Sequence, residues 1–408
     1  MPGPQRPKNT QLWPVDGIFP AELVADNRQV GGPFGTTWNG EIRHAKRSSA
    51  KLIQLYGNGF TGTFIDSDQR QQLYADQKKA TGFGSFAEVA HTFGFASKFE
   101  YELTLPYIWE MVFWPGCLPG AAQERGDCVS HASSGAQRTT IAGDIACCMP
   151  DEVSKKLEGI PKIDPVGIKN GVTSSEYQYW FRGYDGDGWS CPTAAEVSLQ
   201  RGCLLRNDYG TVDMRDYSGR LAGKYGRRSP PDEITALGSP HVLHGVVEAN
   251  SFEEIADACG SLRGINSCGG QGFSSTRDKY GYSPRRGGWS HGYKFSGTDG
   301  RKEIRAIFGE PLVLNNNNWG IWNSGPRDIY QSAALVPKIQ ALVNRVCGFS
   351  VDLVRCDIVN AQTGNLMIPP GCWWCKWSEV KNRDYSVYAG IKGWDRPLLR
   401  DTWKTGLG

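Results

Sequence analysis

Apolar and polar residues are spaced so that they predict helices mainly in the earlier part of the chain. Three Ser/Thr-x-x-Glu sequences have the pattern of a capping box, in which a hydroxyl and a carboxylate satisfy free backbone N–H groups of the first helical turn. They begin at Ser85, Thr193 and Ser251, and each is followed by a short stretch that ends at a glycine. Apolar residues at helical spacing predict three further helices, over residues 66–80, 128–142 and 335–346.

Strand-like patterns are more frequent later in the chain. Residues 98–116 alternate apolar side chains for part of their length and are interpreted as a strand followed by a turn. The glycine-rich sequence at 269–272 is interpreted as a turn. The remaining predicted strands are residues 304–308, 311–314, 349–354, 372–377 and 385–391. The predicted helices lie mainly in the earlier part of the chain and the predicted strands in the later part. This order predicts an α+β fold in which helices and strands are segregated.

The chain of 408 residues is too long for one small domain, and its composition changes along its length. Residues 1–50 are rich in Gly, Pro, Asn and Thr, which is typical of an extended N-terminal arm. We expect an accessory helical or mixed region over 51–110 and a main domain over 111–408. Within the main domain, the polar stretch 207–240 contains a Pro-Pro pair and is predicted to be a loop insertion.

Composition and charge exclude several classes of protein. An apolar fraction of 39% with 14 tryptophans supports a sizeable core, and a net charge of +3 gives no electrostatic footprint for nucleic acid. No apolar run approaches the roughly 20 residues that span a bilayer. The first residues lack the apolar core of a signal peptide, so we expect a protein of the cytoplasm or of a larger particle, not a classically secreted one. In a reducing compartment its 12 cysteines are expected to be thiols rather than disulfides.

The candidate chemistry begins at Cys128, which follows a Gly-Asp pair and opens a predicted helix. A thiol at a helix start lies at the positive end of the helix dipole, which favours the thiolate. The thiolate attacks carbonyl carbon, but it needs a base to hold its proton and a group to orient that base. His131, on the same helix, has no evident orienting group, so we interpret it as a packing residue.

His291 is the stronger candidate for the base. Small residues flank it in the sequence Gly-Gly-Trp-Ser-His-Gly-Tyr, so a substrate or another backbone can approach its imidazole. Downstream, Asn317 belongs to a run of four asparagines that follows a predicted strand, and an amide there can accept the second ring N–H of the histidine. Trp319 and Trp322 can cover that hydrogen bond from water.

Three short sequences around Cys128, His291 and Asn317 occur in the order Gly-Asp-Cys, Ser-His-Gly and Asn-Asn-Trp-Gly. In that order and setting they resemble the papain superfamily of cysteine peptidases, of the divergent kind found in bacterial and phage proteins. The resemblance extends over about residues 111–400. It implies a papain-like two-lobed fold, in which a helical lobe carries the cysteine, an antiparallel β lobe carries the histidine, and the cleft between them holds an extended peptide.

The resemblance also assigns roles. Cys128 resembles the nucleophile, His291 the general base that later protonates the leaving amine, and Asn317 the residue that orients the base. Gln123 resembles the side-chain donor of the oxyanion hole, whose other donor is the backbone N–H of the cysteine. It stands one position closer to the cysteine than in the family, so either the loop is shorter or Gln123 is not that donor. The resemblance implies no cofactor and no metal.

The implied activity is that of a thiol peptidase, which cleaves peptide or protein substrates through a thioester. Two alternatives stay open. One is a peptidoglycan amidase or endopeptidase. The other is a catalytically silent papain-fold protein of a large assembly such as a phage virion, in which the N-terminal arm would bind a docking partner. The Cys-x-x-Cys sequence formed by Cys372 and Cys375 has no second pair at the spacing of a zinc site, so we expect no metal there.

Overall fold

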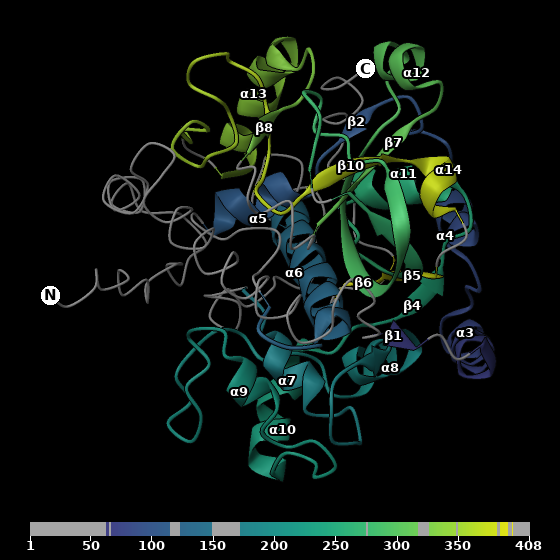
Figure 1. The fold of residues 1–408 in the computed structure, drawn as a ribbon, viewed down its shortest axis with the longest axis vertical. Coiled ribbons are helices and arrows are strands. Elements are labelled where there is room, and N and C mark those ends of the chain that lie inside the picture. The colour runs from purple at the N-terminus through teal and green to yellow at the C-terminus, as the bar shows by residue number, and fades with distance from the viewer. Residues whose placement is uncertain are drawn as a thin grey trace, which may run out of the picture.

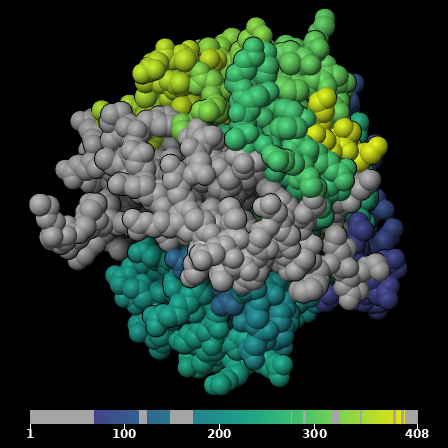
Figure 2. Space-filling model, in the orientation of Figure 1, coloured from purple at the N-terminus to yellow at the C-terminus, as the bar shows by residue number. Residues whose placement is uncertain are grey.

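The structure is a computed structural model, and the residues that it describes are 63–64, 67–114, 123–148, 172–274, 276–316, 326–347, 350–381, 384–390 and 394. The predicted N-terminal arm over residues 1–50 lies outside them. The described residues combine helices with an antiparallel sheet, so the predicted α+β class is confirmed. Figure 1 shows a helical half below and a sheet above, with one long helix between them, and Figure 2 shows the same two halves as solid surfaces.

Seven strands of the described residues form one antiparallel sheet in the order β10-β7-β6-β5-β11-β4, and β2 pairs with β6 beside that path. They are β2 (Leu103–Thr104), β4 (Val246–Glu248), β5 (Ile265–Phe273), β6 (Arg285–Asp299), β7 (Leu312–Asn315), β10 (Trp373–Lys376) and β11 (Asp384–Tyr388). The long strands β5 and β6 align Cys268 with Gly292 and Gly269 with His291. The sheet therefore carries the candidate base in its middle.

The helical half is built around α6 (Cys128–Cys148), the helix between the two halves in Figure 1. It packs against β5 and β6 on one side and against α7 and α8 on the other. The other helices of this half are α7 (Ser175–Tyr179), α8 (Cys191–Gln200), α9 (Gly219–Ala222), α10 (Asp232–Gly238) and the 3-10 turn η2 (Ser239–His241). Among the described residues, no helix combines the length and the apolar character that crossing a membrane requires.

Short elements from other parts of the chain surround these two halves. Earlier ones are β1 (Thr63–Phe64), α3 (Ser67–Thr81), α4 (Phe86–Thr92), α5 (Tyr107–Phe113) and β3 (Trp189–Ser190). Later ones are α11 (Phe252–Gly260), α12 (Lys302–Phe308), β8 (Arg327–Asp328), η4 (Ala333–Leu335), α13 (Val336–Cys347), β9 (Met367–Ile368) and α14 (Trp377–Val380). Because β1 pairs with β3, α3 packs against α8 and α4 packs against α11, the described part of residues 51–110 contacts both halves. The domain boundaries drawn from the sequence stay predictions.

Two of the three predicted capping boxes begin helices. The Ser85 hydroxyl accepts the N–H of Glu88 at the start of α4, and the Ser251 hydroxyl accepts the N–H of Glu254 at the start of α11. The third prediction is wrong, because α8 begins earlier, at Cys191, with proline in its first turn. Thr193 instead accepts a hydrogen bond from the Gln69 side chain at 2.8 Å.

The predicted strand and turn over residues 98–116 is wrong for most of its length. Among its described residues, 98–114, only Leu103 and Thr104 form a strand, and residues 107–113 form α5. Every residue of α5 is buried, Glu110 included. A helix that is buried on all sides has no polar face, so its sequence shows no helical period.

Three further secondary-structure predictions are wrong. Residues 304–308 lie in α12, where Ile304 is buried but Ile307 is 41% exposed, so the apolar run does not mark one buried face. Residues 269–272 continue β5 through two register shifts rather than forming a turn. Residues 350–354 form no strand in the described part of the chain.

The predicted loop insertion over residues 207–240 contains α9 and α10 instead of a bare loop. Its apolar side chains Val212, Met214 and Ile234 are buried in a cluster with Tyr177 and Trp180 of the α7 region. The insertion is therefore packed onto the helical half, and this contact gives it a fixed position beside α7.

A buried charge cluster joins α5, α6 and β6. The Glu110 carboxylate accepts hydrogen bonds from Arg138 Nε at 2.6 Å and Thr139 Oγ1 at 2.5 Å, and it pairs with the Lys294 ammonium. Burial alone raises the pKa of Glu110, but Lys294 and Arg138 outweigh it, so the pKa is lowered overall. Burial, with Arg138 adding to it, lowers the pKa of Lys294 in spite of Glu110. The cluster thus holds two cations around one carboxylate.

Removing the cap of α11 gives a small, checkable loss of stability. The Ser251→Ala variant should lower the free energy of unfolding by about 1 kcal/mol, because the Glu254 N–H loses its acceptor. Urea denaturation followed by circular dichroism measures the change. The control is Ser239→Ala, whose exposed hydroxyl donates only to the Ala236 carbonyl and which should change stability by less than about 0.5 kcal/mol. Equal losses in the two variants would contradict the capping role.

Candidate active site

Cys128 is the first residue of α6, so the predicted helix start is observed and the helix extends to Cys148. Its side chain is fully buried in a cluster that includes Tyr179, Trp189 and Cys268. The phenol of Tyr184 lies near enough for the charge of Cys128 to contribute to its raised pKa of about 12, which burial mainly causes. The thiol therefore lies at the positive end of α6, between the helical half and the sheet.

Gly292 brings strand β6 against the first turn of α6. A Cβ atom on Gly292 would lie 2.9 Å from the Val129 Cα, 3.1 Å from its N and 3.2 Å from the Cys128 carbonyl oxygen. Only a glycine allows β6 and α6 to approach this closely. Because His291 is adjacent to Gly292 on β6, the backbone of the candidate base also lies near the first turn of α6.

The His291 ring is held on the sheet by aromatic contact. It is 3% exposed and meets the Tyr293 ring edge-on, with 4.6 Å between the ring centroids. Tyr293 in turn packs against Trp373 of β10, with 5.2 Å between centroids. Strand β10 thus supports the ring that orients the histidine.

The asparagine run begins at the end of β7. Asn315 pairs with Phe295 across the sheet, and the Asn316 N–H donates to the Lys294 carbonyl at 3.2 Å, while its side chain accepts the Lys294 N–H at 3.2 Å. Asn316 is therefore fixed against the strand that carries His291. The residues predicted to orient and cover the histidine lie outside the described part of the chain: Asn317, Trp319 and Trp322.

Gln123 begins the turn that leads into α6 and is 1% exposed. The carbonyl of Gly126 in this turn accepts the Gly188 N–H at 2.9 Å and the Tyr179 hydroxyl at 3.3 Å. The turn between the candidate oxyanion donor and Cys128 is thus bonded to the glycine-rich loop that precedes β3. The role of Gln123 as an oxyanion donor stays a prediction.

His131 packs inside the helical half, but it does have an orienting group that the sequence did not indicate, the Asp127 carboxylate. Its Nε2 lies 3.4 Å from the Asp127 Oδ2 and 3.2 Å from the Ser175 hydroxyl, and its ring meets the Tyr217 ring at 4.7 Å between centroids. These contacts lie on the side of α6 that faces α7. The His131 ring therefore contacts residues of the helical half and does not face β6.

A disulfide between Cys191 and Cys268 corrects the expectation that all cysteines are thiols. It joins the first residue of α8 to β5, and its two cysteines share the buried cluster of Cys128. No sequence spacing signals this pair, because its members lie far apart and on different kinds of element. Cys372 and Cys375 are buried and not disulfide-bonded, and the described residues hold no group of three or more metal-binding side chains.

An open hollow of about 850 Å³ lies away from this site. It is lined by the β8 and β9 strands and the loops beside them, including Arg277, Arg327, Asn360 and Met367. It shares no residue with the first turn of α6 or with the centre of β6. The hollow therefore bears on neither the candidate nucleophile nor the candidate base.

Comparison with known proteins gives distant similarities only. No family model matches the chain, and no curated protein matches it. Xylellain, a cysteine protease from Xylella fastidiosa, is 12% identical with a TM-score of 0.33, over 65% of this chain and 79% of that one. Digestive procathepsin L 3 from the larval midgut of Tenebrio molitor is 12% identical with a TM-score of 0.29, over 67% of this chain and 89% of that one. Such TM-scores do not establish a shared fold, so the functional case rests on the site.

Proposed function

We propose that this protein is a papain-like thiol peptidase in which Cys128 is the nucleophile and His291 the general base. Gln123 and the backbone N–H of Cys128 form the oxyanion hole, and Asn317 orients the base. The substrate is an extended peptide that lies between the helical half and the sheet. The alternative of a catalytically silent protein in a large assembly is favoured by one observation, the full burial of the Cys128 side chain.

The observation that carries the proposal is the contact of Gly292 with the backbone of Cys128 and Val129. It joins two segments that are far apart in sequence, and each carries one half of a thiolate–imidazole pair. A thiol at a helix start with an adjacent histidine is the arrangement that activates sulfur as a nucleophile.

The chemistry follows from these positions. The Cys128 thiolate attacks the peptide carbonyl, and the resulting oxyanion accepts hydrogen bonds from Gln123 and the Cys128 N–H. His291 protonates the leaving amine, which leaves a thioester on the sulfur. His291 then takes a proton from water, and the hydroxide releases the acid product. Loss of one oxyanion donor is expected to cost roughly 10²–10³ in rate.

Alkylation by a thiol-reactive epoxide tests the proposal. At pH 6 an ordinary thiol is less than about 1% thiolate, because its pKa is near 8.5. A thiolate paired with imidazolium persists at that pH, so Cys128 should be alkylated at least about tenfold faster than Cys147. Cys147 is the matched control, because it lies at the other end of α6, is partly exposed and is not disulfide-bonded. Mass spectrometry of tryptic peptides gives both rates.

Equal rates at Cys128 and Cys147 would contradict the proposal and favour the structural alternative. Reaction of Cys128 only after unfolding would also contradict the proposal. The Cys128 side chain is fully buried in this structure, and such a result would show that the reagent does not reach it in the folded protein. Assays with casein and with purified cell wall as separate substrates distinguish the peptidase from the peptidoglycan amidase or endopeptidase. Release of peptides from casein supports the peptidase, and release of wall fragments alone supports the peptidoglycan alternative.

A further inference from the structure

We propose that Tyr217 is a positioning residue for the reaction at Cys128, because its hydroxyl fastens the turn of residues 124–127 that precedes the nucleophile. The inference rests on the proposed peptidase function and adds a residue that the sequence pattern does not contain. Tyr217 belongs to the segment 207–240, which the sequence alone presents as a polar insertion.

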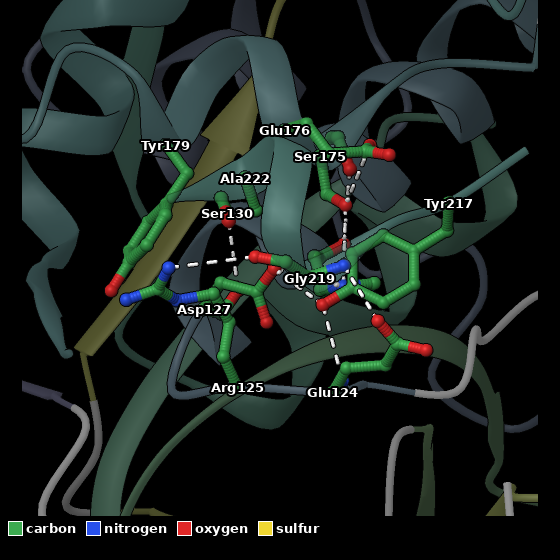
Figure 3. Close-up of polar contacts among 12 residues, drawn as sticks. Glu124, Arg125, Asp127, Ser130, Ser175, Glu176, Tyr179, Tyr217, Gly219 and Ala222 are labelled. Carbon is green, nitrogen blue, oxygen red and sulfur yellow. Dashed lines mark hydrogen bonds and ion pairs between the residues drawn. The ribbon is translucent and has the colours of Figure 1, made fainter. Parts of the chain in front are cut away.

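The Tyr217 hydroxyl bridges the two ends of this turn. It accepts the backbone N–H of Glu124 at 3.1 Å and donates to the Asp127 Oδ2 at 2.9 Å (Figure 3). Burial, and then the negative charge of Asp127, raise the pKa of Tyr217 well above its usual range. The hydroxyl therefore keeps its proton and acts as acceptor and donor together.

The neighbouring residue Gly219 adds a second hold on the same turn. Its N–H donates to the Glu124 Oε2 at 2.8 Å, as Figure 3 shows. A Cβ atom at Gly219 would lie 2.6 Å from the Glu124 Cβ, so only glycine lets the two segments approach this closely. Residues 217–219 therefore form hydrogen bonds with both the backbone and the side chain of Glu124.

Residues 217–219 are themselves hydrogen-bonded to the helical half. The Ser218 N–H donates to the Glu176 Oε1 at 2.9 Å. Glu176 lies on α7 and is paired with Arg206 at 2.8 Å. Residues 217–219 thus connect the buried ion pair of α7 to the turn before Cys128, and they have a fixed point from which to hold it.

The turn matters because it joins the two halves of the proposed oxyanion hole. Gln123 precedes Glu124, and the Cys128 N–H follows Asp127, so the Tyr217 hydroxyl spans the chain between the two donors. Donors to an oxyanion act only when they are already placed where the charge develops. A turn that loses this bridge leaves the sulfur in place but lets the donors separate.

The Tyr217→Phe variant tests this role, because it removes the hydroxyl and keeps the ring against His131. We expect kcat for a peptide substrate to fall about ten- to hundredfold, with KM changed less than about twofold. Alkylation of Cys128 by iodoacetamide needs no oxyanion hole, so its rate should change less than about threefold. A role confined to stability would not separate these two rates.

Tyr209→Phe is the matched control. Tyr209 belongs to the same insertion, and its hydroxyl donates to the Leu205 carbonyl at 2.7 Å. Its kcat should stay within about twofold of the wild type. If Tyr217→Phe fails to fold, Gly219→Ala displaces the same turn while keeping the tyrosine hydroxyl, and it should show the same split between hydrolysis and alkylation.

The outcomes distinguish this inference from the proposed function. A wild-type protein that hydrolyses peptides, with kcat unchanged in Tyr217→Phe, would overturn the positioning role and leave the peptidase standing. Parallel losses of hydrolysis and alkylation would overturn it too, since they indicate damage to the nucleophile itself. A wild-type protein without hydrolysis and without fast Cys128 alkylation would overturn the peptidase, and the positioning role with it.

Discussion

Substitution of Gly292 is expected to lower kcat/KM in proportion to the size of the added side chain, about tenfold for alanine and about a hundredfold for valine. Alanine brings a Cβ atom to 2.9 Å from the Val129 Cα, which is backbone and cannot rotate away. Strand β6 and helix α6 must then separate, and His291 moves with β6. A misplacement of about 1 Å in a reacting group can cost roughly 10² in rate.

Steady-state kinetics of the two variants measure this effect, and circular dichroism shows whether they remain folded. Gly84→Ala is the control, because the atoms nearest to its Cβ belong to the flexible Lys78 side chain. Its kcat/KM should match that of the wild type. A folded Gly292→Val variant with full activity would contradict the role of this contact in placing His291.

Glu110→Gln is expected to be the most destabilising of the substitutions considered, by about 3–5 kcal/mol. The change leaves Lys294 and Arg138 buried without the carboxylate that both of them contact. An uncompensated buried charge costs far more than an ion pair contributes at the surface. The exposed pair of Lys78 and Glu88 is the control, and Glu88→Gln should cost less than about 1 kcal/mol.

At low pH, the difference in the free energy of unfolding between the wild type and Glu110→Gln should disappear. The pKa of Glu110 is lowered in the folded protein, so its contribution is fully present above the unfolded carboxylate pKa of about 4.3. The contribution is lost as pH falls through the lower, folded pKa. Urea denaturation at several pH values should therefore show wild type and Glu110→Gln converging below about pH 4. A gap that stays constant down to pH 2 would contradict the ionised state of Glu110.

Features encoded by neighbouring residues could be predicted from the sequence. The caps at Ser85 and Ser251 need only a hydroxyl and the N–H three residues on, and both are observed. The start of α6 at Cys128 is equally local. Thr193 fits the same pattern but fails, because Pro192 in the first turn lets the helix begin earlier.

Features that depend on distant partners could not be predicted. Helix α5 (Tyr107–Phe113) is buried on every side, and its one charged residue, Glu110, is matched by Lys294 from a remote strand. Tyr217 reaches Glu124 and Asp127 across a long separation in sequence. No residue spacing or periodic pattern in the sequence indicates either contact, because the partners come together only when the chain is folded.

The bond between Cys191 and Cys268 makes the choice of reducing agent an experimental variable. A small thiol that restores an oxidised Cys128 also exchanges with a disulfide by attack on one of its sulfurs. Here the two reactions have opposed results. One recovers the proposed nucleophile, Cys128, and the other releases α8 from β5 in the buried cluster that contains Cys128. Turnover measured against dithiol concentration should therefore pass through a maximum, whereas a thiol enzyme without such a bridge would reach a plateau.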